Sequence, residues 1–258
     1  MELTNINKRS QHLFFSCLWP DIPRNDYVIQ SRREWYSRHI NKGYEAKVLI
    51  DDNGAIVGKC QTIPVEYSPL IGNDLMIILC LYVHMYDQYI GDQRGKGYGR
   101  YMLKEVENLA RIRGYSGVAT WAMDWHWNPK SFYEHMGYEV VDRIDKAVVL
   151  WKPFHNAIAP RFYRLHQMAG KNKKINVFVG DNAWCDGNQK TRIARKAIEG
   201  IERMVEYHES FCPCHNRMLH LGHVGGVFLD GEPYKPYELI GDPVELRQKI
   251  IELYQKKV

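Results

Sequence analysis

A glycine-rich loop that leads into an amphipathic helix constrains this chain more than any other stretch. Residues 94–99 read Arg-Gly-Lys-Gly-Tyr-Gly, and the basic Arg100 follows. An apolar run at residues 75–83 precedes the loop, and residues 100–113 have the spacing of a helix with one apolar face. The first N–H groups of a helix have no partner within it, and glycine lets a ligand approach the backbone closely. The loop therefore predicts a site for a ligand that carries phosphate.

Three kinds of glycine loop can be compared with this one. A nucleotide triphosphate loop needs G-x-x-x-x-G-K-[ST], and no such string occurs in the chain. A dinucleotide loop needs G-x-G-x-x-G after a strand and an acidic residue about 20 positions later. The spacing here is G-x-G-x-G, although Asp124 follows the next strand-like run and keeps that interpretation open. A surface turn that only caps a helix is the third interpretation.

The composition is that of a soluble globular protein. Of the 258 residues, 45% are hydrophobic and 25% are charged. The net charge of +5 suits a polyanionic cofactor but is too small to indicate nucleic acid as a partner. We find no signal peptide and no apolar stretch long enough to span a membrane, so we expect a cytoplasmic protein with six reduced cysteines.

The first part of the chain predicts helices followed by an antiparallel meander. Residues 10–18 and 27–40 are the expected helices within a largely helical first 45 residues. The expected strands are residues 46–50, 55–64 and 74–83, with an Asp-Asp-Asn-Gly turn between the first two. Strands that come as hairpins, rather than as β-α-β units, count against a dinucleotide fold.

After the glycine loop the pattern alternates again. We expect strands at residues 117–122, 138–141 and 147–151, and a short helix at 130–136. A change of composition after Trp151 predicts a second domain. Its expected elements are a short helix at 161–168, a strand at 175–179, a long helix at 189–208, a hairpin at 226–229 and 234–239, and a last helix that begins after Asp242.

The string Arg94-x-x-Gly97-x-Gly99 resembles the [RQ]-x-x-G-x-[GA] pyrophosphate loop of the GNAT family, the GCN5-related N-acetyltransferases. The order of elements over residues 1–152 is also similar to that family. The resemblance implies a mixed α/β fold with a central, mostly antiparallel sheet. It also implies an enzyme that transfers acetyl from acetyl-CoA directly to an amine on a small molecule or a protein, and a homodimer is one assembly we would expect.

The resemblance also implies which residues hold the cofactor. In this family the backbone of one strand pairs with the pantetheine amides, and the glycine loop binds the pyrophosphate. An Asn also commonly contacts CoA, and here Asn128 stands nearer to the catalytic Tyr than is usual. The expected cofactor-binding residues are Leu81, Tyr82, Val83, Arg94, Gly95, Lys96, Gly97, Tyr98, Gly99, Arg100 and Asn128.

Two residues are expected to be catalytic. The string Phe132-Tyr133-x-x-x-Gly137-Tyr138 resembles the second family signature, which implies that Tyr133 protonates the leaving thiolate. A phenol stays protonated at neutral pH, which suits that role. His84 follows the cofactor strand, and an imidazole suits a general base. Glu66 and Asp87 are alternative bases.

The second domain predicts a different chemistry. Residues 153–174 are the expected linker, and residues 175–258 look like a reduced thioredoxin-like domain, a pairing similar to YoaP-type acetyltransferases. Cys185 stands where such a domain carries W-C-x-x-C, but Asn188 replaces the second cysteine. Cysteines and histidines at residues 212–223 do not have a usual zinc spacing, so no metal site is assigned. As an alternative function, these cysteines would make a thiol- or metal-sensing module with regulatory or vestigial acyl-CoA binding.

Overall fold

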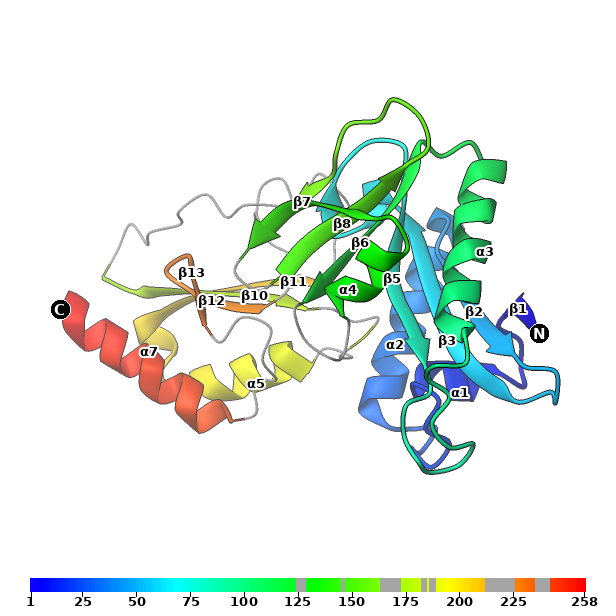
Figure 1. Ribbon diagram of the computed structural model, residues 1–258. Coiled ribbons are helices and arrows are strands. Elements are labelled where there is room, and N and C mark those ends of the chain that lie inside the picture. Colours follow the sequence, from blue (N-terminus) through cyan, green and yellow to red (C-terminus); the bar gives the residue numbers. More distant parts are fainter. Residues whose placement is uncertain are drawn as a thin grey trace. The chain divides into compact units, whose positions relative to one another are not determined.

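The chain forms two compact units, Met1–Phe162 and Tyr163–Val258. A computed structural model describes residues 1–123, 129–144, 147–162, 173–181, 185, 189–211, 226–234 and 242–258. Each unit has its own sheet and its own cluster of buried apolar side chains, and Figure 1 labels their elements. The two units are therefore described separately.

A seven-stranded sheet forms the centre of the N-terminal unit. In spatial order its strands are β1 (Glu2–Asn5), β2 (Glu45–Ile50), β3 (Ile56–Pro64), β5 (Leu75–Val83), β6 (Gly117–Met123), β8 (Ala147–Pro153) and β7 (Glu139–Ile144). Neighbouring strands run antiparallel except β5 and β6, which pair in parallel. The predicted mixed α/β fold with a mostly antiparallel sheet is confirmed.

Two short strands depart from the sequence prediction. The first 45 residues were expected to be helical, but β1 pairs with β2 along the edge of the sheet. A helix was expected to begin at Arg161, but β9 (Arg161–Phe162) pairs with β4 (Leu70–Ile71) instead. The Phe162 side chain is buried, and its backbone N–H donates to Asp142, so tertiary contacts override a weak helical pattern.

Helices cover both faces of this sheet. In Figure 1, α3 (Tyr98–Ile112) and α4 (Lys130–His135) lie in front of it and α2 (Tyr27–His39) lies behind. The helix α1 (Gln11–Phe15) contributes Phe14 and Phe15 to the core, and the short helical turns are η1 (Ile40–Lys42) and η2 (Val65–Tyr67). The predicted apolar face of α3 packs on the sheet through Met102, Leu103, Val106 and Ala110. Each of the larger side chains contributes about 1.5–3 kcal/mol by its burial, which fixes the start of α3 near the end of β5.

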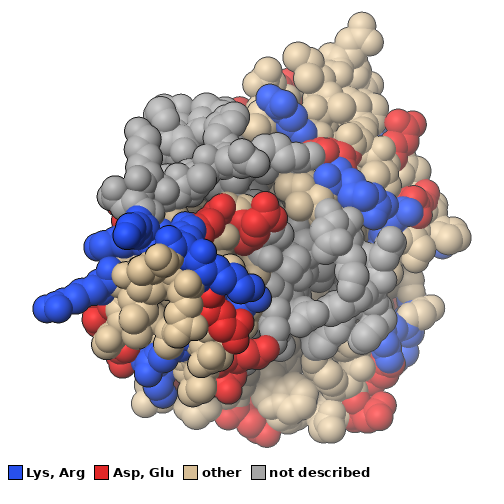
Figure 2. Space-filling model, turned by 90° about the vertical axis from the view of Figure 1, so that its left-hand side faces the viewer, with Lys and Arg blue, Asp and Glu red and all other residues tan. Residues whose placement is uncertain are grey.

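The C-terminal unit has a four-stranded sheet. Its strands, in spatial order, are β11 (Val205–Phe211), β10 (Ile175–Asp181), β12 (Gly226–Leu229) and β13 (Glu232–Tyr234). The pair β10 and β11 is parallel, and the other two pairs are antiparallel. The helices are α5 (Gln189–Ile198), the short η3 (Glu202–Met204) and α7 (Pro243–Lys257), which begins at the capping residue Asp242. On the face drawn in Figure 2, basic side chains lie among acidic ones.

The long helix predicted at residues 189–208 is wrong. The helix α5 ends at Ile198, and Gly200 adopts φ +82°, a left-handed conformation that ends helices. Residues 205–211 then form β11, in which Val205 and the partly buried Tyr207 pack on the core. The alternation of residues after Gly200 has the period of a strand rather than of a helix.

No helix in the described part of the chain has the length and apolar character that a membrane crossing would need.

Gly117 provides a test of how tightly the sheet is packed. A Cβ there would lie 2.8 Å from the backbone oxygen of Lys152 and 3.1 Å from Cα of Pro153. Backbone atoms cannot move without breaking the β6–β8 pair, so we expect Gly117→Ala to lower the free energy of unfolding by about 1–3 kcal/mol. Urea denaturation measures this. The control is Gly99→Ala, whose Cβ would make an ordinary 3.4 Å contact with Phe132 and should cost nothing. Equal stability of both variants would contradict the packing.

Candidate active site

The parallel pair β5–β6 opens into a fork. Pairing runs from Leu75 opposite Gly117 to Ile78 opposite Thr120, and there it stops. The strand β5 nevertheless continues to Val83, still paired on its other side with β3. A register shift between β3 and β5 occurs at the same level, because Ile78 and Cys80 face consecutive residues of β3. Over residues 79–83, the edge of β5 that points away from β3 has no paired strand in the described residues.

The glycine loop ends at the start of α3. Gly97 precedes the first turn with φ +84°, and Gly95 adopts φ +76°, two left-handed conformations that favour glycine. No side chain caps this end of the helix. The first hydrogen bond of α3 is the one that the Tyr101 N–H donates to the Gly97 carbonyl. The N–H groups of the preceding turn therefore point out of the helix toward an exposed surface, where the helix dipole favours an anion.

Basic side chains of this loop are held by neighbours. Arg94 donates to the Asp92 carboxylate through Nε and Nη2, at 2.9 and 2.6 Å from Oδ2. These hydrogen bonds, with one from the Arg94 backbone, hold the pKa of Asp92 at about 2. Lys96 donates to Gln93 at 2.9 Å. Neighbouring side chains thus hold both basic groups, and Arg94 and Lys96 are exposed.

The start of α3 lies against the fork. A Cβ on Gly99 would be 3.4 Å from the Phe132 ring and 3.9 Å from Leu81 Cδ2. Phe132 belongs to α4, and Leu81 belongs to the unpaired part of β5. The structure therefore brings the glycine loop, the open edge of β5 and the helix of Tyr133 to one place.

Tyr133 lies at the closed end of the fork. Its side chain is only 2% exposed and forms a hydrogen bond with Thr120, the last β6 residue paired with β5. The Thr120 hydroxyl donates in turn to the carbonyl of Ile78 at 3.1 Å. Burial raises the pKa of Tyr133 above its ordinary value, and the hydrogen bond with Thr120 offsets part of that rise. The phenol stays protonated at neutral pH.

His84 lies just beyond β5, where it anchors the loop that follows. Its ring is 1% exposed, and Nδ1 is 3.0 Å from the carbonyl oxygen of Gly91. A carbonyl can only accept, so Nδ1 carries the hydrogen and Nε2 of the neutral ring has a lone pair. That Nε2 is buried and has no hydrogen-bond partner among the described residues. The alternative bases, Glu66 and Asp87, are both exposed.

Some predicted site residues lie outside the described part of the structure. Asn128 is one, and the segments that hold the predicted cysteine and histidine cluster at 212–223 and most of the loop around Cys185 are others. Cys185 itself is exposed. Within the described ranges, no three His, Cys, Asp or Glu side chains come together in a way that could hold a metal ion.

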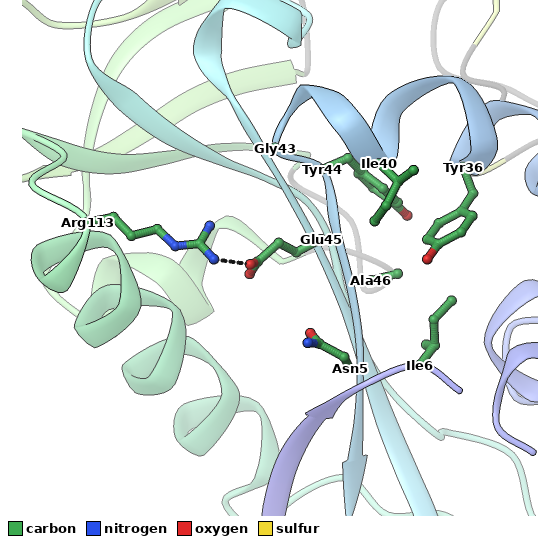
Figure 3. A pocket seen from close by; sticks show the side chains of 9 residues that line it. All are labelled: Asn5, Ile6, Tyr36, Ile40, Gly43, Tyr44, Glu45, Ala46 and Arg113. Carbon is green, nitrogen blue, oxygen red and sulfur yellow. Dashed lines mark hydrogen bonds and ion pairs between the residues drawn. The ribbon is translucent and has the colours of Figure 1, made fainter. Parts of the chain in front are cut away.

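A cavity of about 340 Å³ lies elsewhere in the N-terminal unit. Figure 3 shows Tyr36 of α2 on one side of it and the Arg113–Glu45 ion pair on the other. Arg113 follows the C-terminus of α3, which at 15 residues places it about 22 Å from Gly97. This cavity is therefore separate from the fork and contains no residue expected to bind the cofactor.

Sequence reasoning missed three residues of this site. Thr120 joins Tyr133 to the fork, and its signal was a lone polar residue within an apolar strand. Asp92 fixes Arg94, and an acid two residues before an arginine was the available sign. Phe132 packs on Gly99, and nothing in the sequence indicates this contact, because it depends on how α4 meets α3.

Comparisons with known proteins agree with this geometry. Residues 44–140 match the family model described as the acetyltransferase (GNAT) domain. A comparison with curated proteins finds no significant match.

Solved structures with a similar arrangement include GNAT proteins from several bacteria. A GNAT-family acetyltransferase from Staphylococcus aureus Mu50 is 15% identical, covers 60% of this chain and 99% of its own, and has a TM-score of 0.44. The ribosomal-protein-alanine N-acetyltransferase of Brucella melitensis is 16% identical over 60% of this chain and 100% of its own, with a TM-score of 0.45. The Escherichia coli GNAT protein YhbS, solved with CoA, is 14% identical, covers 63% of this chain and 89% of its own, and has a TM-score of 0.43. At TM-scores below 0.5 these likenesses carry no inference about function.

The fork and the glycine loop both lie within residues 44–140, the segment that matches the acetyltransferase (GNAT) domain model.

The contact between Tyr133 and Thr120 can be measured as a coupling energy. We expect Tyr133→Phe and Thr120→Val each to destabilise the protein, since each leaves a buried polar group without its partner. The double variant should cost less than the sum of the singles, by about 0.5–1.5 kcal/mol. Urea denaturation of all four proteins gives this value. Strict additivity would show that the two hydroxyl groups do not interact.

Proposed function

We propose that this protein is an acetyl-CoA-dependent N-acetyltransferase that moves acetyl directly to an amine acceptor in a ternary complex. The observation that carries the proposal is the fork between β5 and β6, which opens beside the N-terminus of α3 within a GNAT domain. A dinucleotide is the weaker alternative, because the strands before the loop are antiparallel rather than β-α-β units.

The pyrophosphate of the cofactor would bind at the glycine loop. The open N–H groups at the start of α3 provide hydrogen bonds to phosphate oxygens, and the helix dipole adds to them. Gly95 and Gly97 hold the turn, and no atom lies within 4 Å of the positions where their Cβ atoms would be. Arg94, Lys96 and Arg100 would supply positive charge around the phosphates.

The pantetheine arm would lie in the fork. Over residues 79–83 the outer edge of β5 offers backbone groups that an extended amide chain can pair with, as an added strand would. Leu81, Tyr82 and Val83 are the residues we assign to this contact, and one of their N–H groups would polarise the thioester carbonyl. The cofactor would then run from the loop toward Tyr133.

Tyr133 is the residue we assign as the acid. It lies at the closed end of the fork, where the thioester would be, and its phenol is protonated. Since its pKa is raised, Tyr133 loses its proton only above pH 10, so it contributes no fall in rate below that pH. It acts by donating a hydrogen bond, and then its proton, to the developing thiolate.

His84 is the residue we assign as the base. The lone pair on Nε2 and the fixed Nδ1–H support this role, because a ring oriented by a carbonyl can accept a proton only at its other nitrogen. His84 follows Val83 directly, so it stands at the end of the strand that would hold the cofactor. The acceptor amine would approach from this side of β5.

The C-terminal unit is proposed to be a thioredoxin-like domain over residues 175–258, joined to residues 1–152 by a linker at 153–174. Its order of elements supports this: a strand, a helix and a parallel strand, then an antiparallel hairpin and a closing helix. The division between the two units after Phe162 falls within the proposed linker.

The loop conformation provides the first test. Acetyl-CoA at 100 times its dissociation constant should stabilise the protein by about 2.7 kcal/mol, which a thermal shift assay detects. We expect Gly97→Ala to weaken binding at least tenfold, because a Cβ at φ +84° distorts the loop.

Gly114→Ala is the matched control. Gly114 has φ +80° at the other end of the same helix and equally open surroundings. An alanine there meets the same backbone strain but lies outside the glycine loop. Both variants should lose similar stability, and only Gly97→Ala should lose binding. The proposal would be overturned if a dinucleotide stabilised the protein and acetyl-CoA did not.

The acid role provides a second test. We expect Tyr133→Phe to reduce kcat by about 10²-fold or more, with little change in the KM for acetyl-CoA, because the lost proton donor acts on the leaving group. The acceptor for the assay comes from a screen of amines that consume acetyl-CoA. Tyr138→Phe is the control, since Tyr138 is a second buried tyrosine whose ring centroid is 5.6 Å from that of Tyr133. Wild-type turnover in Tyr133→Phe would exclude the role.

A further inference from the structure

Cys17 lies in an unusual position just after α1. The residue is half-buried, and its backbone adopts φ +55° in the connection that leads toward α2. None of the functions assigned above uses this residue. Its surroundings, however, are those of a reactive group rather than of a core cysteine.

A buried lysine contacts the sulfur. Lys59 stands in the middle of β3 and is 1% exposed. Its Nζ donates to Cys17 Sγ and to the Phe14 carbonyl, both at 3.1 Å, and lies 5.0 Å from the centre of the Phe14 ring. Among the described residues no carboxylate forms an ion pair with Lys59. A buried ammonium group without a counter-charge is strongly unfavourable.

The Cys17 thiol is the acidic group that can supply that counter-charge. Arg32, from α2, adds a second positive charge beside the sulfur. Burial alone raises the pKa of the Cys17 thiol, but the charges of Lys59 and Arg32 and their hydrogen bonds outweigh it, so the pKa lies below its ordinary value. The two positive charges therefore stabilise the thiolate form relative to that of an ordinary cysteine.

The third neighbour is Tyr82 on β5. Lys59 and Tyr82 are directly opposite each other in the β3–β5 pair, so their side chains lie on the same face of the sheet as Cys17. Burial, followed by Tyr86 and the charge of Cys17, raises the pKa of Tyr82, which therefore stays neutral beside the thiolate. The groups that face the sulfur are thus two cations and one neutral phenol.

We propose that Cys17 is a nucleophile whose thiolate form is stabilised by Lys59 and Arg32, and that it is a modification site for small electrophiles such as peroxides. The thiolate attacks one oxygen of hydrogen peroxide and the O–O bond breaks. The sulfur is oxidised to sulfenate, and the peroxide is reduced to hydroxide, which takes up a proton to leave as water. The inference does not depend on the proposed acetyltransferase activity.

Modification here would act on the cofactor strand. Tyr82 is one of the β5 residues beyond the end of the β5–β6 pair, and the charge of Cys17 acts on its phenol. An added group on the sulfur would occupy space on this face of β5. This placement gives the modification a route to the acyl-CoA site.

The pH dependence of alkylation tests the proposal directly. Iodoacetamide labels the protein at a series of pH values, and peptide mass spectrometry gives the rate at Cys17 alone. In the protein unfolded with urea the rate should fall about 50-fold from pH 8.5 to 6.5, as for a thiol of pKa near 8.5. In the native protein we expect a fall of less than about tenfold. The same steep fall in both states would overturn the proposal.

The Lys59→Met variant separates the effect of the lysine charge on thiol ionisation from the access of the reagent to the sulfur. We expect it to restore the steep pH dependence, because the slope reports the ionisation of the thiol and is independent of how well the reagent reaches it. Lys47→Met, which removes a half-buried lysine of the neighbouring β2, should leave the native slope unchanged. If Lys59→Met does not fold, Arg32→Gln should shift the slope in the same direction, and no shift would contradict the assignment.

Peroxide completes the test. With hydrogen peroxide at neutral pH, dimedone should capture sulfenate at Cys17 in the wild type and several-fold less in Lys59→Met. The buried Cys60, whose pKa is raised by burial, is the internal negative control. Preferential capture at another cysteine, or equal capture in both proteins, would refute a thiolate held by Lys59.

Discussion

The end of the β5–β6 pair at Ile78 and Thr120 is the constraint on which the N-terminal unit depends. A parallel pair needs a crossover, and α3 provides it, so the loop before α3 must lie at the carboxyl end of β5. Because the pairing stops early, the backbone of β5 is left with an open edge at that same end. The anion site and the strand edge are therefore neighbours by topology, and Tyr133 closes the site through Thr120.

Burial sets the protonation states of the two reactive side chains on this sheet. Tyr133 is surrounded by apolar side chains and a neutral hydroxyl, so desolvation keeps it neutral. Cys17 has cations beside it, so their charges outweigh the same desolvation and its pKa lies below the ordinary value. The difference comes from the cations Lys59, which is buried in the middle of β3, and Arg32. The pKa shifts of Tyr133 and Cys17 therefore depend on the groups around each side chain as well as on its residue type.

The sequence predicted the parts of this fold that depend on local periodicity. The meander, α3 with its apolar face, and the position of the glycine loop all follow from alternation or from helical spacing, and the structure has each of them. The early end of the β5–β6 pair does not follow from local periodicity, since pairing depends on where two distant strands diverge. The edge strand β1 and the bond between Tyr133 and Thr120 depend on similar long-range contacts. The helix predicted over residues 199–208 is wrong for a local reason, because Gly200 ends α5 and the residues after it alternate as a strand.

Hydrogen exchange with and without acetyl-CoA tests the central claim most directly, because it reports on backbone amides without requiring a known acceptor. If the fork and the start of α3 hold the cofactor, saturating acetyl-CoA should slow exchange in peptides that cover residues 79–83 and 95–101. Peptides from β10 and α7, in the other unit, should be unchanged. Slower exchange confined to other segments, or none at saturation, would contradict the account.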